Sequence, residues 1–234
     1  MGMESPDLER LVNVYKSNSD KYATPTQLES IASNTLRAKE AMKKDFMLLK
    51  EVVSLIEIFA KKSLFDKRPE FLESAVVSTL YALSRTNYTI GAAVEYITTL
   101  ANASNKPDLI TLATETADSI KKFYGMRVSL EEASQLVRCI KDNSRGYYPL
   151  RKTSEVAKEL VTEIIESGYK IADVIGWIQR IPKYSTKKMD FITTANSAIQ
   201  TIEALAETRF GFDEHARVMG FYHNLSTMPY LPQV

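Results

Sequence analysis

The sequence is poor in the residue types that build disulfide frameworks and metal centres. Its 234 residues include one cysteine and two histidines. The single Cys139 excludes an internal disulfide framework and a cysteine-based zinc site. His215 and His223 are eight residues apart on nearly one helical face, which is too far to share a metal ion, and no third ligand accompanies them. We therefore expect neither a metal site nor a cofactor.

Long apolar runs and a strong excess of charge are also absent. No stretch approaches the roughly 20 apolar residues that a membrane-spanning helix needs, and the formal net charge is +1. The N-terminus has neither the basic start nor the apolar run of a secretory signal. We expect a cytoplasmic protein without a membrane partner.

Phosphate-binding loops, dinucleotide fingerprints and serine-hydrolase elbows are missing too, so we expect no enzymatic activity. The alternative is an enzyme whose active site is a pocket of polar residues between helices.

The apolar residues that are present recur in helical pairs. Residues 153–182 contain two runs with apolar side chains at spacings of three and four, separated by Ser167-Gly168-Tyr169. Gly168 suits the end of the first helix because glycine adopts a positive φ without strain. Ser154 is the expected cap of the first helix, and Pro182 is expected to end the second. Neither helix can bury its apolar stripe alone, so the pair needs neighbours.

This unit recurs at a period of about 41 residues. Counterparts of Ile171 are found at Ile90, Leu130 and Phe212, and positions at helical spacing around each are apolar in nearly every unit. Three glycines are expected in the turns within units: Gly125, Gly168 and Gly211. Periods of 20–50 residues are typical of stacked supersecondary units. The alternative is an irregular multi-helix bundle whose helices have similar lengths.

We predict an all-α fold in which tandem antiparallel helix pairs stack as a short right-handed α-solenoid. A single domain would span residues 1–234, with an N-terminal cap helix in 1–23 and a degenerate first unit in 24–68. Four helical-hairpin units would follow in 69–224, and an extended tail in 225–234. The helical stretch of residues 25–62 lacks glycine and proline after Pro25, so it is either one helix or two with a break at Asp45; we favour the break.

Paired helices at this period resemble HEAT and armadillo-type repeat proteins. HEAT repeats often carry an Asp in the turn between helices and a basic residue in the second helix, and Asp213 with Arg217 is similar to that pattern. The resemblance covers the chain from about residue 69 onward. It implies a curved stack that holds partners on an extended surface, and it implies no chemistry.

A second apolar stripe on the later helix of each unit suggests where a protein partner would bind. Six residues after each repeat start stand Tyr96, Leu136, Trp177 and Val218, flanked by basic residues. Aromatic and arginine side chains dominate binding energy at interfaces. The candidate partner-binding residues are Tyr96, Arg138, Trp177, Arg180 and Arg217, with Trp177 the expected exposed anchor. The alternative is that the stripe packs one unit against the next.

The connectors between units suggest a second function, because they carry 12 basic residues against five acidic ones. In a stack these connectors would lie along one edge and could meet the phosphates of a nucleic acid. The candidate basic-edge residues are Lys67, Arg68, Lys106, Arg145, Lys152, Lys183, Lys187 and Lys188. The alternative is that these are ordinary solvated loops.

The leading hypothesis is a non-enzymatic protein-binding or scaffold module. Nucleic-acid binding is the runner-up, and a homo-oligomer is possible through an uncapped terminal unit.

Overall fold

The described part of the chain is built from helices. The computed structural model describes residues 6–20, 23–42, 48–64, 67–105, 107–180 and 189–208. For residues 207 and 208 it describes the backbone alone. In chain order the helices are α1 (Pro6–Asn18), α2 (Pro25–Ala41), α3 (Leu49–Lys62), α4 (Pro69–Ser84), α5 (Ile90–Ala103), α6 (Leu109–Gly125), α7 (Leu130–Asn143), α8 (Leu150–Glu166), α9 (Ile171–Ile178) and α10 (Phe191–Thr208). Within those ranges the β-structure is limited to two isolated bridges.

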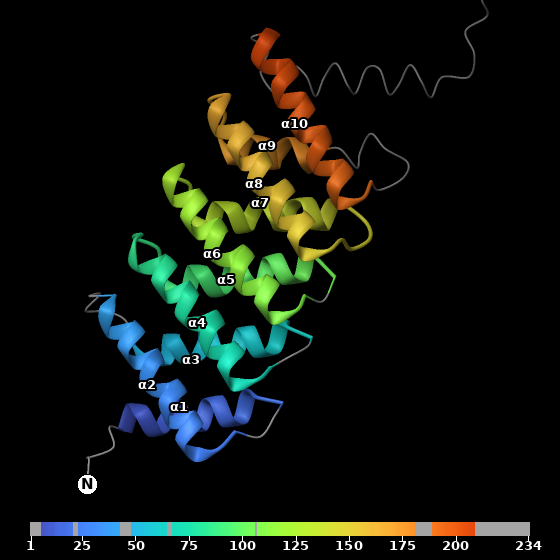
Figure 1. Ribbon diagram of the computed structural model, residues 1–234. Coiled ribbons are helices and arrows are strands. Elements are labelled where there is room, and N and C mark those ends of the chain that lie inside the picture. Colours follow the sequence, from blue (N-terminus) through green and yellow to red (C-terminus); the bar gives the residue numbers. More distant parts are fainter. Residues whose placement is uncertain are drawn as a thin grey trace, which may run out of the picture.

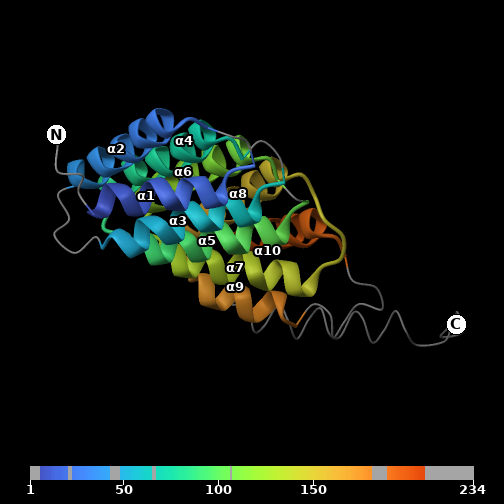
Figure 2. The same ribbon diagram turned by 90° about the horizontal axis from the view of Figure 1, so that it is seen from below.

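The helices form two layers that run side by side along the stack (Figures 1 and 2). Helices two apart in the sequence pack against each other, so that α1, α3, α5, α7 and α9 make one layer. The other layer consists of α2, α4, α6, α8 and α10. Each helix therefore covers the flank of a neighbour in its own layer and the inner face of the other layer. The predicted all-α stack of helix pairs is confirmed.

The repeat phase is visible in where the helices of the first layer begin. After α1, which begins at Pro6, their first residues are Leu49, Ile90, Leu130 and Ile171. The last three are repeat starts expected from the sequence, and Leu49 lies 41 residues before Ile90, within the degenerate first unit. All four side chains are buried. Because the same apolar position begins each helix, the stripes that follow face the same neighbours in every unit. The remaining expected start, Phe212, lies outside the described residues.

Local capping explains where several helices of the second layer begin. Thr24 accepts a hydrogen bond from the backbone N–H of Gln27, whose side chain in turn accepts one from the Thr24 backbone, and Pro25 opens α2. Asp108 and Asp190 each bind a threonine three residues later through both its backbone N–H and its hydroxyl. Residues 25–62 contain the two helices α2 and α3, as favoured above, although the expected break point at Asp45 lies outside the described residues.

Two details of the expected helix ends are wrong. Ser154 does not cap the first helix of its unit, because α8 already begins at Leu150 directly after Pro149, and Ser154 is buried inside the helix. Gly125 does not occupy the turn either, since it is the last residue of α6. The positive φ at that turn belongs to Arg127, at 58°, in the place that Gly168 takes one unit later with a φ of 75°.

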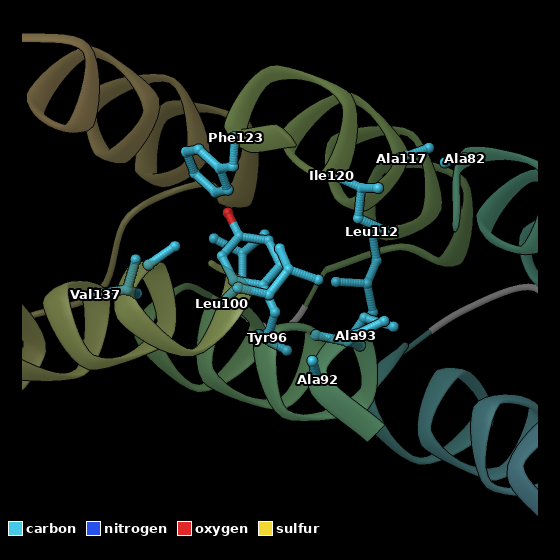
Figure 3. Close-up of a cluster of buried hydrophobic side chains, with 14 of the residues drawn as sticks. Ala82, Ala92, Ala93, Tyr96, Leu100, Leu112, Ala117, Ile120, Phe123 and Val137 are labelled. Carbon is cyan, nitrogen blue, oxygen red and sulfur yellow. The ribbon is translucent and has the colours of Figure 1, made fainter. Parts of the chain in front are cut away.

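The core runs without interruption between the two layers. Figure 3 shows its centre, where Tyr96 and Leu100 of α5 meet Leu112, Ile120 and Phe123 of α6. The rings of Tyr96 and Phe123 meet edge to face, with their centroids 5.7 Å apart, an arrangement that aromatic pairs prefer. The apolar residues that define the repeat are therefore the residues that hold the layers together.

Candidate functional site

The second stripe, which was expected to contact a partner, faces the core instead. Tyr96 has no exposed surface and Trp177 is only 6% exposed. The Tyr96 hydroxyl donates a hydrogen bond of 3.0 Å to Ser119 Oγ of α6, and burial raises its pKa well above the usual range. The expectation of an exposed anchor at Trp177 is therefore wrong. Each helix contacts helices of its own layer and of the opposite layer. These contacts bury more of its circumference than pairing with a single partner helix would.

The arginines that flank this stripe point away from it. Arg138 of α7 forms an ion pair with Glu95 of α5, with 2.8 Å between the guanidinium nitrogen and the carboxylate oxygen, on the outer face of the first layer. Arg180 is exposed just beyond α9. Arg217 lies outside the described residues. The structure thus does not bring the five expected partner-binding residues together on one exposed surface.

The connectors lie along one edge of the stack, as expected, and backbone hydrogen bonds join them (Figure 1). Each donor is an N–H near the start of one connector, and each acceptor is a carbonyl near the end of the next. The donor and acceptor pairs are Asp20 and Lys67, Leu64 and Pro107, Asn105 and Tyr148, and Arg145 and Met189, at 2.8 to 3.2 Å. We call this side of the molecule the connector edge. Its ladder fixes the spacing between successive units.

Several basic residues of the connector edge already have partners within the chain. Lys67 Nζ is 4.0 Å from the carboxylate of Asp20, and the guanidinium of Arg68 lies 3.9 Å from the ring centroid of Phe71. Arg145 and Lys152 are exposed, and Tyr147, which lies between them in the sequence, is 59% exposed and holds the Lys141 ammonium over its ring. The other expected basic residues lie outside the described residues: Lys106, Lys183, Lys187 and Lys188. The described part of this edge thus offers a small basic patch around Arg145 and Lys152.

The opposite edge carries a pocket that the sequence reasoning missed. The turns between the helices of each unit form this turn edge. Between the α4–α5 and α6–α7 turns lies a cavity of about 700 Å³, lined among others by Asn87, Tyr88, Tyr124, Arg127 and Glu131. We call it the turn-edge pocket. Two successive units build its wall, so the pocket exists only in the stacked arrangement.

Two tyrosines form the aromatic part of that wall. The rings of Tyr88 and Tyr124 stand at 86° to each other with their centroids 5.8 Å apart. The Tyr88 hydroxyl donates a hydrogen bond to the backbone carbonyl of Val128 in the next unit. That bond fixes the Tyr88 ring in place. Tyr124 is 43% exposed and stands at the mouth.

Acidic residues at the start of α7 set the charge of the pocket. Burial raises the pKa of Tyr88 to about 12, and the nearby negative charges of Glu131 and Glu132 act in the same direction. The Glu132 carboxylate is held by the backbone N–H and the hydroxyl of Ser129, which caps α7. Glu131 is exposed at the pocket wall. Arg127 carries the opposing charge.

A sequence signal for this pocket existed but lay at the ends of the helices. Tyr88 stands two residues before the repeat start Ile90, and Tyr169 stands two residues before Ile171. The repeat was recognised from apolar positions inside the helices, so tyrosines in the turns did not contribute to its recognition. Tyr124 was equally hidden, since it follows the buried Phe123 in the last turn of α6.

Comparison of the chain with protein-family models, curated proteins and solved structures finds no match. Function must therefore be inferred from the chain's own geometry. Among the described residues, no three His, Cys, Asp or Glu side chains are grouped so as to hold a metal ion. In the same part of the chain, no helix combines the length and apolar character required to cross a membrane.

Proposed function

We propose that this chain is a non-enzymatic binding module, a scaffold that holds a protein partner against its turn edge. One observation carries the proposal: successive units expose large apolar side chains at the ends of their second-layer helices. These residues are Tyr81 of α4, Tyr124 of α6 and Ile165 of α8. Tyrosine is enriched at protein interfaces, because its ring offers a large contact area and its hydroxyl a polar contact.

The partner-binding test compares two exposed tyrosines on opposite edges. The tagged full chain is retrieved from its native cells as wild type, as Tyr124→Ala and as Tyr147→Ala. Tyr147 is the matched control, because it is at least as exposed as Tyr124 but stands on the connector edge. Interface hot spots cost at least about 2 kcal/mol on truncation, so we expect Tyr124→Ala to weaken binding of the co-purifying protein by roughly thirtyfold or more.

Affinity is then measured with the purified partner, so that recovery from cells is not the only readout. Unchanged binding by Tyr124→Ala, or equal loss with Tyr147→Ala, would remove the turn edge from the proposal. Far-UV circular dichroism and the melting temperature of each variant verify that the fold is retained. If the recovered partner is a second copy of the chain, light scattering will report a dimer that Tyr124→Ala dissociates.

Nucleic-acid binding is the second candidate, favoured by the stacking of connectors along one edge. Arg145 and Lys152 are exposed on this edge, and so is Tyr147, whose ring carries the Lys141 ammonium 3.7 Å from its centroid. The double variant Arg145→Glu/Lys152→Glu should abolish a gel shift seen at low salt, and wild-type binding should fall steeply as salt rises. Absence of any shift with the wild-type chain at low salt would eliminate this candidate.

A further inference from the structure

We propose that the turn-edge pocket binds a cationic group, the side chain of a lysine or arginine presented by a protein partner. The inference rests on the proposed binding function and names the chemistry that the partner must bring. It depends on the aromatic wall, the acidic residues beside it and the fact that this combination is not repeated at the next described turn, between α8 and α9.

The aromatic wall offers a cation more than one ring surface. Because the Tyr88 and Tyr124 rings are nearly perpendicular and 5.8 Å apart, the edge of one ring meets the face of the other. In the corner between them, the ring that contributes its edge keeps both of its own faces outside that contact. A cation within about 6 Å of a ring centroid is attracted by the negative face of the ring. Tyr124 is exposed enough for an incoming side chain to reach this corner.

The charged groups of the pocket favour a cation over an anion. Glu131 lines the cavity, and Glu132 follows it within electrostatic reach of the Tyr88 hydroxyl. Within the lining Arg127 balances Glu131, so the excess negative charge comes from Glu132, whose carboxylate is bound by Ser129 beside the lining. The helix dipoles roughly offset each other here, because the C-terminal ends of α4 and α6 and the N-terminal ends of α5 and α7 all meet at this edge.

The stack does not require this set of residues. One unit later, the position of Tyr124 is taken by Ile165, that of Glu131 by Ala172 and that of Arg127 by Gly168. The described turn between α8 and α9 folds in the same way: the Tyr169 N–H donates to the Ile164 carbonyl as the Val128 N–H does to Phe123, both at 3.0 Å. The fold of this turn therefore does not depend on the tyrosine at position 124 or the glutamate at position 131.

The test titrates the full chain, carrying ¹³C-labelled tyrosine rings, with three capped tripeptides. Their central residues are lysine, trimethyllysine and the uncharged norleucine, all flanked by glycine. We expect the lysine and trimethyllysine peptides to shift the ring signals of Tyr88 and Tyr124 with dissociation constants on the order of 1–10 mM, because one cation–π contact is weak. The ring of Tyr147, on the other edge, should not move.

Charge variants give the inference a signed prediction. Glu131→Gln should weaken lysine-peptide binding by roughly fivefold, as expected for one partly exposed charge interaction. Arg127→Gly should strengthen binding, because it removes the opposing charge at a position whose φ suits glycine. Tyr124→Leu keeps an apolar side chain at the mouth but lacks the ring, and should abolish the response.

Three results would overturn the inference. They are unmoved Tyr88 and Tyr124 signals at saturating lysine peptide, equal shifts with the norleucine peptide, and shifts produced by acetate or phosphate instead. Loss of partner binding in Tyr124→Ala without any lysine-peptide response would leave the binding function intact and reject the cationic ligand. A lysine-peptide response with no partner dependent on Tyr124 would reject the proposed function alone.

Discussion

The ion pair between Glu115 of α6 and Lys158 of α8 tests how burial changes the contribution of an ion pair to stability when the distance between the charges stays the same. Lys158 Nζ lies 2.9 Å from the Glu115 carboxylate, and the two side chains are 14% and 9% exposed. At an effective dielectric constant of 20, opposite charges at this distance attract each other by about 6 kcal/mol. Removing two charges from water costs several kcal/mol for each ion. The intact pair should therefore contribute little net free energy, while breaking it should be expensive.

We expect Lys158→Met to lower the free energy of unfolding by about 3–5 kcal/mol, because it leaves a buried carboxylate without its partner. Glu115→Gln should cost less, since the long stem of Lys158 can carry its ammonium to water. The double variant Glu115→Gln/Lys158→Met should recover most of the loss. Urea unfolding at pH 7, followed by far-UV circular dichroism, measures all four chains.

The control is the ion pair between Glu95 and Arg138. Its charged atoms are 2.8 Å apart, but the side chains are 44% and 52% exposed. Exposed pairs are worth about 0.2–1 kcal/mol, so Arg138→Met should change stability by less than about 1 kcal/mol. If Lys158→Met costs no more than Arg138→Met, or if the losses of the two single variants simply add in the double variant, the reasoning about burial is refuted.

Three further predictions concern turns, caps and buried hydroxyls. Gly168→Ala should destabilise the chain by about 1 kcal/mol because φ is 75° there, whereas Gly176→Ala inside α9, where a Cβ meets nothing within 4 Å, should not; equal melting temperatures would contradict this. Asp108→Ala should cost about 1 kcal/mol at pH 7: burial alone would raise the pKa of Asp108, but the hydrogen bonds from Thr111 lower it. The ionised cap therefore stabilises the fold above the unfolded pKa of about 3.9, and the difference from wild type should vanish as the pH falls below about 4; a pH-independent difference in urea unfolding would exclude the charge effect. Thr116→Val should stabilise the chain by up to about 1 kcal/mol, since the buried hydroxyl has no partner among the described residues; a lower urea midpoint would show that it has one.

The repeat was predictable because burial follows helical periodicity. The starts at Ile90, Leu130 and Ile171 came from spacing alone, and the break between α2 and α3 was expected at Asp45, ahead of the helix that begins at Leu49. Turn geometry was less predictable. Arg127 adopts a positive φ that the sequence would assign to a glycine, because the surrounding hydrogen bonds of the turn outweigh the local preference.

The binding surface was not predictable by the same means. Trp177 was expected to be exposed because aromatic residues dominate interfaces, yet it is buried. The turn-edge pocket needs two units in register, and nothing in the separate spacings of Tyr88 and Tyr124 shows that their rings meet. The helical period reports which side chains face the core, but which exposed residues meet across a junction depends on the relative placement of whole units.

The residues that break the repeat are the ones that the fold does not explain. Lys158 stands one period after Ala117 and one before Ile199, so an apolar side chain suffices at that position in neighbouring units. Glu115 likewise stands where α8 has Val156. If stacking alone had shaped this chain, the buried positions of Glu115 and Lys158 would be apolar throughout. Their charged side chains and those of Tyr124 and Glu131 cluster on α6 and the elements beside it, so the junctions that α6 makes with α5, α7 and α8 are where a function beyond stacking should be sought.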